Sequence, residues 1–310
     1  MKLSSFVHVL GLTLFSYLLL NSLAFGQEEA LPSWNSSNTK TAILEYIKDI
    51  SNTSSPNHIK VEDRIAVFDN DGTLMLEAPQ TAESEFTNDY YANWIGKKSD
   101  TSFLQGLKRL FSRPSKEEST IGLSLEAYHE AVNRWQKTYK HPRFQRSYSH
   151  LVYKPMLELL SLLKENSFTS YISTGSEREF IRGFADTAYG LSPDRIIGSD
   201  RQYTYCFSEE GSFLLRQFRE PHLNLNEFKA INIQKHIGKR PIFVVGNTDG
   251  DIQMLEYSQS SPLPSIQILI RHDDPVKEYS YINGAERVFS LAEKRGWKIV
   301  SIQRDWKDVF

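Results

Sequence analysis

The chain has 310 residues, with 36 lysines and arginines against 38 aspartates and glutamates, so its formal net charge is −2. This length can hold one large α/β domain with an insertion, or two modest domains, and 40% hydrophobic residues are ordinary for a globular protein. Without residues 1–26, whose single charged side chain is Lys2, 35 basic and 38 acidic residues give −3. This balance gives no electrostatic reason to expect nucleic acid or an anionic membrane as partner. The single Cys206 excludes an intrachain disulfide.

Residues 1–26 have the pattern of a secretory signal. Lys2 supplies the positive start, Phe6 to Leu20 is mostly apolar, and Ala24-Phe25-Gly26 offers small residues for cleavage. An uncleaved membrane anchor is the alternative, although the apolar run is short for a span. We therefore expect cleavage near Gly26 and an exported protein, periplasmic or secreted, with no membrane contact in its mature form.

Residues 27–76 are predicted to form an N-terminal segment and the first strand of the core. Isoleucines at helical spacing predict a short helix over 41–50. The apolar run Ile65–Phe68 predicts a buried strand, which stops at Asp69-Asn70-Asp71 before Gly72 and a threonine. Because residues two apart on a strand point the same way, Asp69 and Asp71 should meet at its carboxyl end. Open α/β sheets bind their ligands at that edge.

Two carboxylates at this position suit phosphoryl transfer. One can attack phosphorus and carry the phosphoryl group, while the other protonates the leaving alkoxide and then activates water. Mg²⁺ prefers carboxylate, carbonyl and water oxygens and would offset the crowded negative charge. A solvated turn after a strand is the plain alternative for Asp-Asn-Asp-Gly. An EF-hand loop is excluded, because its glycine stands sixth and it lies between helices.

Residues 77–150 are predicted to form a helical insertion. Ser124 can cap a helix whose apolar stripe includes Tyr128 and Trp135, and a second helix is expected over 103–111. Aromatic residues are dense here, and they could form a cage for a cationic substrate or simply a core. Arg143 and Arg146 could approach an anionic substrate or belong to a solvated loop.

Residues 151–310 are predicted to complete an α/β core. Pro155 opens a helix, and the strand 168–173 ends at Ser173, followed by a turn at Thr174-Gly175 and a helix over 179–189. A hydroxyl and free N–H groups at a helix N-terminus can bind an anion. Ser173 could equally serve as an ordinary helix cap.

The chain continues with a short strand at 195–198 and a hairpin of 202–208 with 213–218. Lys229 opens a predicted helix, and we prefer it to Lys235 as a site residue because Lys235 leaves too few residues to turn back into the next strand. That strand, 241–246, ends at Asn247, with Asp249 and Asp251 following. Strands at 266–270 and 298–302 and a helix at 285–295 complete the core. The polar run 271–274 could touch substrate or form a loop.

The four stretches together resemble the motifs of the haloacid dehalogenase-like (HAD) hydrolase superfamily. Ile65–Leu74 resembles its first motif, 168–175 its second, Lys229 its third and 241–255 its fourth. The finer resemblance is to secreted, phosphoserine-phosphatase-like members. It implies that Asp69 is the nucleophile and Asp71 the general acid and base. Dehalogenases lack an acid at the place of Asp71, and ion-pumping ATPases have threonine, so Asp71 favours hydrolysis.

The resemblance further implies the ligands of phosphate and metal. Phosphate would be bound by Ser173, Thr174 and Lys229. Mg²⁺ would be held by Asp69, Asp71, Asn247, Asp249 and Asp251, with the direct ligand among the last three left open. Asn247 departs from the usual aspartate of the fourth motif.

We therefore expect a Rossmann-like parallel sheet, the HAD core, with an inserted helical cap. The expected function is Mg²⁺-dependent hydrolysis of a small phosphomonoester, of the phosphoserine or phosphorylcholine kind, through an aspartyl-phosphate outside the cytoplasm. The alternative is a non-catalytic exported protein that uses the same carboxylates to bind a metal or a partner. The oligomeric state is not predicted.

Overall fold

The computed structural model describes residues 30–97, 122–209, 211–217 and 222–310. Every helix and strand described here belongs to one compact unit, Ser33–Phe310. The predicted signal, the helix expected over 103–111 and the loop after it lie outside the described residues. No helix in the described ranges is long and apolar enough to cross a bilayer.

The core is a six-stranded, wholly parallel sheet with strand order β3-β2-β1-β6-β7-β8. Its strands are β1 (Ile65–Phe68), β2 (Thr169–Glu177), β3 (Ile196–Ser199), β6 (Phe243–Gly246), β7 (Ile266–Arg271) and β8 (Lys298–Ser301). Residues of β1, β3 and β6 are buried throughout, as strands covered on both faces must be. The Rossmann-like parallel sheet is therefore confirmed.

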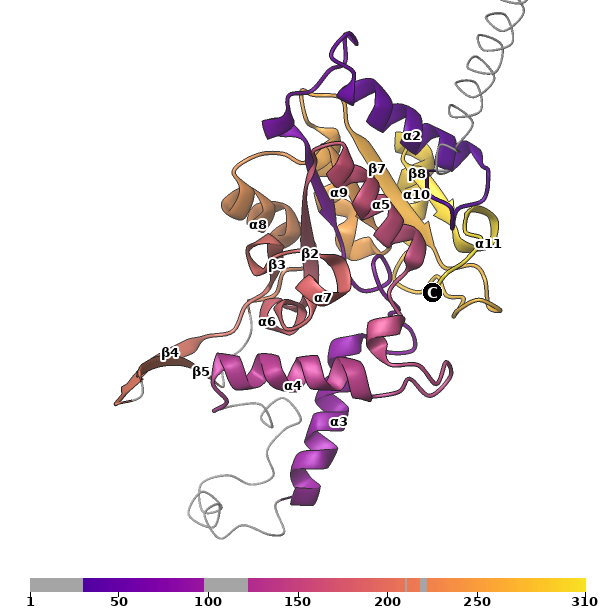
Figure 1. Cartoon of the computed structure of the whole chain (residues 1–310). Helices are drawn as coiled ribbons and strands as arrows, with labels where there is room; N and C mark the ends of the chain where they lie inside the picture. The colour runs from indigo at the N-terminus through magenta and orange to yellow at the C-terminus, as the bar shows by residue number, and fades with distance from the viewer. Residues whose placement is uncertain (1–29, 98–121, 210, 218–221) are drawn as a thin grey trace, which may run out of the picture. The chain divides into compact units, whose positions relative to one another are not determined.

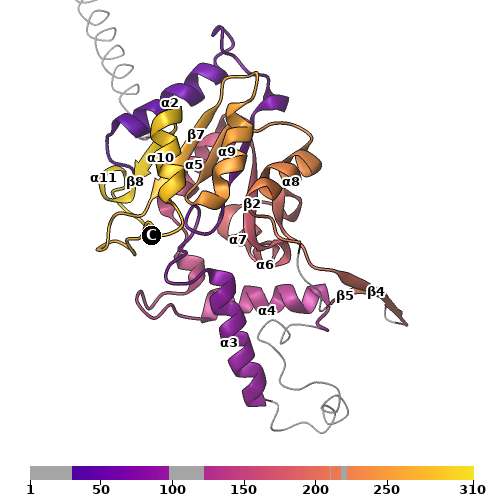
Figure 2. The ribbon, with the colours of Figure 1, turned by 180° about the vertical axis from the view of Figure 1, so that it is seen from behind.

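Helices cover both faces of this sheet. On one face, shown toward the viewer in Figure 2, lie α8 (Glu227–Ile237), α9 (Ile252–Gln259) and α10 (Glu286–Arg295). Their apolar residues join Ile65, Val67 and Val244 in one buried cluster. The other face carries α2 (Asn38–Ser51) and α5 (Lys154–Glu165), which lie in front in Figure 1. Tyr46 of α2 packs against Phe243 there. Both faces of the central strands are therefore covered by helices and shielded from water.

The direction of the chain through the sheet reverses beside β1. From β1 the chain moves outward through β2 and β3, and it returns to the other side of β1 at β6 before continuing to β7 and β8. Ala66 pairs with Ser170 on one side and Phe243 on the other. A crevice forms at such a switch point, outside the carboxyl ends of the strands. The residues that follow β1 and β6 therefore face a common space.

The predicted helical insertion contains two described helices, α3 (Ala82–Lys97) and α4 (Leu125–Thr138). Ser124 caps α4 as predicted, since its hydroxyl accepts a hydrogen bond from the N–H of Ala127. Phe86 of α3 packs edge-to-face on Tyr128 and Trp135 of α4. The two helices lie together at one end of the sheet in both views (Figures 1 and 2). Their aromatic rings form a packed core.

The remaining elements are short. They are η1 (Val61–Asp63), η5 (Tyr148–His150), α6 (Arg178–Arg182), α7 (Ala185–Tyr189), η6 (Pro193–Arg195), β4 (Tyr203–Ser208), β5 (Gly211–Arg216), η7 (Asp249–Asp251) and α11 (Ile302–Asp305). The strands β4 and β5 form the expected antiparallel hairpin. The single helix predicted over 179–189 is instead divided into α6 and α7, with Gly183 between them.

Candidate active site

Asp69 and Asp71 lie at the carboxyl end of β1, and both line one cavity of about 240 Å³. Each is more than nine-tenths buried. Asn70, between them, points elsewhere, because its side-chain oxygen accepts a hydrogen bond of 2.8 Å from the Tyr189 hydroxyl. The alternation expected of an extended chain therefore continues past the strand and brings the two carboxylates into one space.

Gly72 makes the turn that follows the aspartates. Its φ is +71°, a region that glycine enters without strain. A side chain here would also collide, since a Cβ would lie 2.0 Å from Asn247 Nδ2 and 2.4 Å from Glu77 Oε2. The hydroxyl of Thr73 donates to Asn247 Oδ1 at 3.3 Å. The turn thus fits closely against the end of β6.

Lys229, from α8, joins the first and fourth motifs. Its Nζ lies 2.6 Å from Asp69 Oδ1 and 2.6 Å from Asp251 Oδ1. Burial alone would lower the pKa of Lys229, but Asp251 and Asp69 outweigh it and the pKa is raised. Burial and the Asp251 carboxylate raise the pKa of Asp69, against the opposing charge of Lys229. The alternative lysine, Lys235, is exposed on the same helix.

Asp71 is held through one of its two oxygens. Its Oδ2 accepts hydrogen bonds from the Ser176 hydroxyl at 2.7 Å and the Thr174 hydroxyl at 3.4 Å. Its Oδ1 is buried and has no hydrogen-bond partner within the described part of the chain. Burial raises the pKa of Asp71, and the bond from Ser176 only partly offsets this. Burial therefore works against the charged form of Asp71.

The second motif differs from its prediction. The turn expected at Thr174-Gly175 does not form, because β2 continues to Glu177 with a register irregularity after Ser173. Ser199 donates to the Gly175 carbonyl and holds this extension. Ser173 is fully buried and accepts a hydrogen bond from the Asn224 amide at 3.2 Å. Gly175 and Ser176 line the cavity, which the sequence analysis missed. The sequence did contain one signal: Ser176 lies two residues after Thr174, so both side chains point the same way if the chain stays extended.

The three candidate metal ligands after β6 have different surroundings. Asn247 is buried, and its amide donates to Glu77 Oε2 at 2.9 Å. Asp251 is fully buried, and its Oδ2 accepts the backbone N–H groups of Asn247 and Thr248. The carboxylate of Asp249 instead accepts the N–H of Val288 at 2.8 Å and caps α10. Asn247 and Asp251 thus face the first motif, whereas Asp249 faces a helix.

Two acidic residues of the cavity were missed by sequence analysis. Glu77 follows the first motif, and its Oε2 accepts hydrogen bonds from Asn247 and from the Tyr281 hydroxyl. Glu83 lies in the first turn of α3, and its Oε2 accepts the N–H of Glu177 at 3.0 Å. Burial, followed by the Glu177 carboxylate, raises the pKa of Glu83 to about 7. Burial, followed by Asp71, raises the pKa of Glu77.

The polar run 271–274 supports the site without lining the cavity. His272 is buried, and its Nε2 lies 2.8 Å from the Gly72 carbonyl oxygen while its Nδ1 contacts Glu278. Its ring stacks on Tyr281, with ring centroids 4.4 Å apart. Asp273 accepts the Ser301 hydroxyl. His272 therefore stabilises the turn at Gly72 through its contact with the Gly72 carbonyl oxygen.

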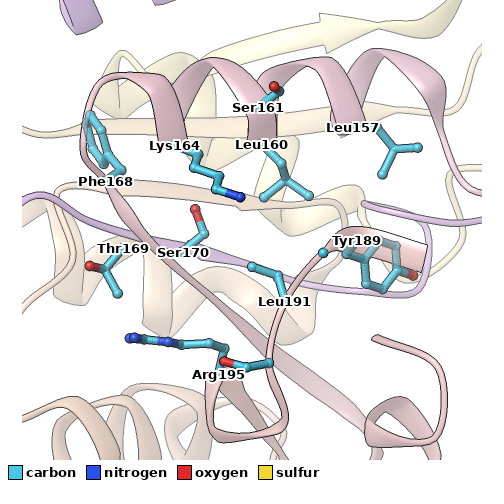
Figure 3. A pocket seen from close by; sticks show the side chains of 12 residues that line it. Leu157, Leu160, Ser161, Lys164, Phe168, Thr169, Ser170, Tyr189, Leu191 and Arg195 are labelled. Atoms are coloured by element: carbon cyan, nitrogen blue, oxygen red, sulfur yellow. The ribbon is translucent and has the colours of Figure 1, made fainter. Parts of the chain in front are cut away.

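A larger cavity of about 380 Å³ lies between α5 and the loop after α7 (Figure 3). Leucines and Phe168 make up much of its wall, with Lys164 and Arg195 as its charged residues. Neither Asp69 nor Asp71 lines it, and Tyr189 separates it from Asn70. Size alone would favour this cavity, but the buried carboxylates and Lys229 make the smaller one the candidate active site.

Whether the smaller cavity suits a cation can be judged from its charges. Four carboxylates line it, those of Asp69, Asp71, Glu77 and Glu83, against Lys229. In the described ranges no group of three histidine, cysteine, aspartate or glutamate side chains is arranged to hold a metal. An amide oxygen at Asn247 is nevertheless a ligand that Mg²⁺ accepts, and Asp71 Oδ1 lacks a partner. The oxygen donors therefore fit a hard divalent cation.

Buried carboxylates and a lysine at the switch point of a parallel α/β sheet form a candidate active site of a Rossmann-like protein. The model of the haloacid dehalogenase-like hydrolase family matches residues 66–256, more than half of the 310 residues. The chain belongs to this family. A search among curated proteins gave no match.

A comparison with solved structures found several that are similar to this chain. A conserved protein of unknown function from Anaerococcus prevotii DSM 20548 is 14% identical, with a TM-score of 0.52, and the alignment covers 90% of this chain and 98% of that one. A phosphoserine phosphohydrolase-like protein from Francisella tularensis is 17% identical, with a TM-score of 0.39 over 76% of this chain and 94% of that one. A phosphoserine phosphatase is 14% identical, with a TM-score of 0.39 and coverages of 78% and 95%.

Proposed function

We propose that the chain is a Mg²⁺-dependent phosphomonoester hydrolase that acts through an aspartyl-phosphate. One observation carries the proposal: a carboxylate paired with a buried lysine lies in the same cavity as a second carboxyl that keeps one oxygen unpartnered. The first arrangement suits a nucleophile held in position, and the second suits an acid that must release and recover a proton.

In the first step Asp69 attacks phosphorus and the bond to the leaving oxygen breaks. Lys229 holds Asp69 Oδ1, so we assign the attack to Oδ2. The departing alkoxide takes the proton of Asp71, and we assign this proton to Oδ1 because Oδ2 already accepts the Ser176 and Thr174 hydroxyls. The raised pKa of Asp71, caused by burial, supports its role as a proton donor.

In the second step Asp71, now a carboxylate, takes a proton from water as the water attacks the phosphorus of the aspartyl-phosphate. Asp69 is released and inorganic phosphate leaves. Lys229, Ser173 and Thr174 are the proposed phosphate-binding residues, and Ser176 joins them as a neighbour of Asp71. Lys229 offers the fixed positive charge that the transferring phosphoryl group requires.

The residues proposed to hold Mg²⁺ are Asp69, Asn247 and Asp251 through their side chains and Asp71 through its backbone carbonyl, because the Asp71 side chain is needed as the acid. The bound ion would supply positive charge against the carboxylates and the incoming phosphate. Asp249 is less suitable as a direct ligand, because its carboxylate caps α10. The proposed substrate is a small phosphorylated metabolite of the phosphoserine or phosphorylcholine kind.

The test is hydrolysis of p-nitrophenyl phosphate by the purified protein with Mg²⁺ and with EDTA. We expect Mg²⁺-dependent release of nitrophenol. A protein that binds Mg²⁺ yet hydrolyses no phosphomonoester would instead support the non-catalytic alternative.

Export is a separate proposal, based on the pattern of residues 1–26. Mass spectrometry of the protein from its own host should give an N-terminus at Gln27. A cytoplasmic protein that begins at Met1 would contradict it.

We expect Asn247→Asp to tighten Mg²⁺ binding by about tenfold, because an added ligand charge strengthens the hold on a hard cation. The amide of Asn247 donates to Glu77, so the new carboxylate faces Glu77 directly and the metal-free variant should be less stable. The measurements are the thermal midpoint against Mg²⁺ concentration and the Mg²⁺ concentration for half-maximal activity.

Asp249→Asn is the matched control, since it changes a neighbouring carboxylate that caps α10. It should lower stability slightly and leave the Mg²⁺ dependence unchanged. An unchanged Mg²⁺ dependence in Asn247→Asp, combined with a sharp change in Asp249→Asn, would show that Asp249 is the ligand.

A further inference from the structure

The cavity contains more negative charge than phosphoryl transfer uses. Beyond Asp69 and Asp71 it is lined by Glu77 and Glu83, neither of which has a role in the proposed steps. Lys229 is the one lysine or arginine among the described residues that line it, and it is already paired with Asp69 and Asp251. The two glutamates therefore face the part of the cavity that remains for the substrate's leaving group.

Glu83 is oriented by a neutral donor. Its Oε2 accepts the backbone N–H of Glu177 at 3.0 Å. The nearby arginines are engaged by the Glu177 side chain, which Arg201 contacts at 2.8 Å and Arg216 at 2.5 Å. Across the described residues, Glu83 forms no ion pair with lysine or arginine. A partly buried carboxylate in this position gains most from a cation that arrives with the ligand.

Glu77 is held in the same manner. Its Oε2 accepts the Asn247 amide at 2.9 Å and the Tyr281 hydroxyl at 2.8 Å, both of them neutral donors. No lysine or arginine in the described ranges pairs with it. A second anionic group on the substrate, such as a carboxylate, would meet repulsion from Glu77 and Glu83.

Tyr128 and Trp135 of the cap do not offer open ring faces for a cage in their observed packing. The Tyr128 ring is covered by the Arg216 guanidinium, 3.6 Å from the ring centre. Trp135 stacks on Tyr148 and Tyr139, with centroids 4.8 Å and 5.1 Å apart. A quaternary ammonium needs open ring faces, whereas a primary ammonium donates hydrogen bonds to carboxylates.

We infer that Glu83, together with Glu77, forms the leaving-group subsite and selects phosphomonoesters that carry a primary ammonium and no second anionic group. This inference rests on the proposed phosphatase function. Phosphoethanolamine is the simplest probe of the class. Phosphorylcholine keeps the charge but lacks the N–H donors, phosphoserine adds a carboxylate, and glycerol 3-phosphate is neutral beyond its phosphate.

The experiment measures kcat/KM for these four esters, with p-nitrophenyl phosphate as a test of phosphatase activity itself. In the wild type we expect phosphoethanolamine to exceed each of the other three by about tenfold or more, the effect of one charge-assisted hydrogen bond. In Glu83→Gln the ratio of phosphoethanolamine to glycerol 3-phosphate should fall toward one, mainly through KM. The amide oxygen of the introduced glutamine can still accept the N–H of Glu177, so α3 keeps its position against the end of β2.

Glu85→Gln is the matched control, because Glu85 lies two residues further along α3, accepts the Tyr139 hydroxyl and does not line the cavity. It should keep the wild-type ratio. A second measurement needs no variant: ethanolamine should inhibit wild-type hydrolysis of p-nitrophenyl phosphate competitively, whereas glycerol at equal concentration and ionic strength should not.

The outcomes separate the two proposals. Hydrolysis of p-nitrophenyl phosphate together with equal use of phosphoethanolamine and glycerol 3-phosphate would overturn the ammonium subsite and leave the phosphatase intact. An unchanged ratio of phosphoethanolamine to glycerol 3-phosphate in Glu83→Gln would show that Glu83 is not part of the ammonium subsite. No hydrolysis of any ester with Mg²⁺ present would overturn the phosphatase function, and the subsite with it.

Discussion

Asp69→Asn should abolish turnover, with kcat falling by at least about 10³-fold, while the protein remains folded. The amide cannot form the acyl-phosphate bond. The fold should tolerate the change, because it removes one of two carboxylates that share Lys229 and leaves the pair with Asp251 intact. The measurements are steady-state hydrolysis of p-nitrophenyl phosphate and urea unfolding.

Asp71→Asn provides the contrast that identifies the mechanism. Its amide has no proton to give to an alkoxide, but p-nitrophenolate leaves without one, so Asp69 should still become phosphorylated. Hydrolysis of the intermediate should then be slow, giving a burst of nitrophenol of about one equivalent. Normal turnover in Asp69→Asn, or the absence of any difference between the two variants, would rule out covalent catalysis by Asp69.

Lys229→Met should both inactivate the protein and destabilise it by roughly 3–5 kcal/mol, the usual cost of removing one partner from a buried ion pair. Asp69 and Asp251, each bonded to Nζ at 2.6 Å, would then face one another with no cation between them. The free energy of unfolding, measured in urea at pH 7, tests this expectation.

The stability that Lys229→Met loses should depend on pH. Burial and the Asp251 carboxylate already raise the pKa of Asp69, and removing Lys229 raises it further. The folded state then binds more protons than the unfolded state, so stability falls as pH rises through the range between the unfolded and folded pKa values. Lys229→Met should therefore lose less stability at pH 5 than at pH 7.

Lys235→Met is the matched control, an exposed lysine on the same helix, for which we expect a change within about 0.5 kcal/mol. Lys229→Met combined with Asp251→Asn should recover stability but not activity. If Lys229→Met alone stays within about 1 kcal/mol of wild type, Lys229 does not neutralise the two carboxylates in solution.

The parts of the site that follow central strands could be predicted from sequence for a simple reason. Buried parallel strands are apolar on both faces, so Ile65–Phe68 and 241–246 stand out as short apolar runs that stop at polar residues. The carboxyl ends of parallel strands share one edge, which brings Asp69, Asp71 and Asn247 together. Lys229 was preferred to Lys235 because of the number of residues left before the next strand, and it lies beside Asp69.

Other features depend on contacts between segments that are far apart in the sequence, and local sequence patterns do not reveal such contacts. The extension of β2 past Ser173 is held by Ser199, and nothing within residues 173–177 indicates that partner. Asp249 stands among metal-binding residue types, but its carboxylate caps a helix that begins at Glu286. Glu83 reaches the cavity only because α3 lies against the extended end of β2. The aromatic residues of the cap have helical spacing, and this spacing is the same for a hydrophobic core and for a ligand cage. The sequence alone therefore could not distinguish the two.

The central position of β1 has a consequence for the order of synthesis. Asp69 is translated early, but its neighbours β2 and β6 and its counter-ion Lys229 come roughly 100 to 180 residues later. A nascent chain that ends before Lys229 therefore lacks half of the sheet and the counter-ion of Asp69, and one that ends before Asp251 still lacks β7 and β8. We therefore expect no N-terminal fragment that ends before Asp251 to have the proposed phosphatase activity. A growing chain should therefore show its first turnover only after the segments that carry Lys229 and Asp251 have folded against β1.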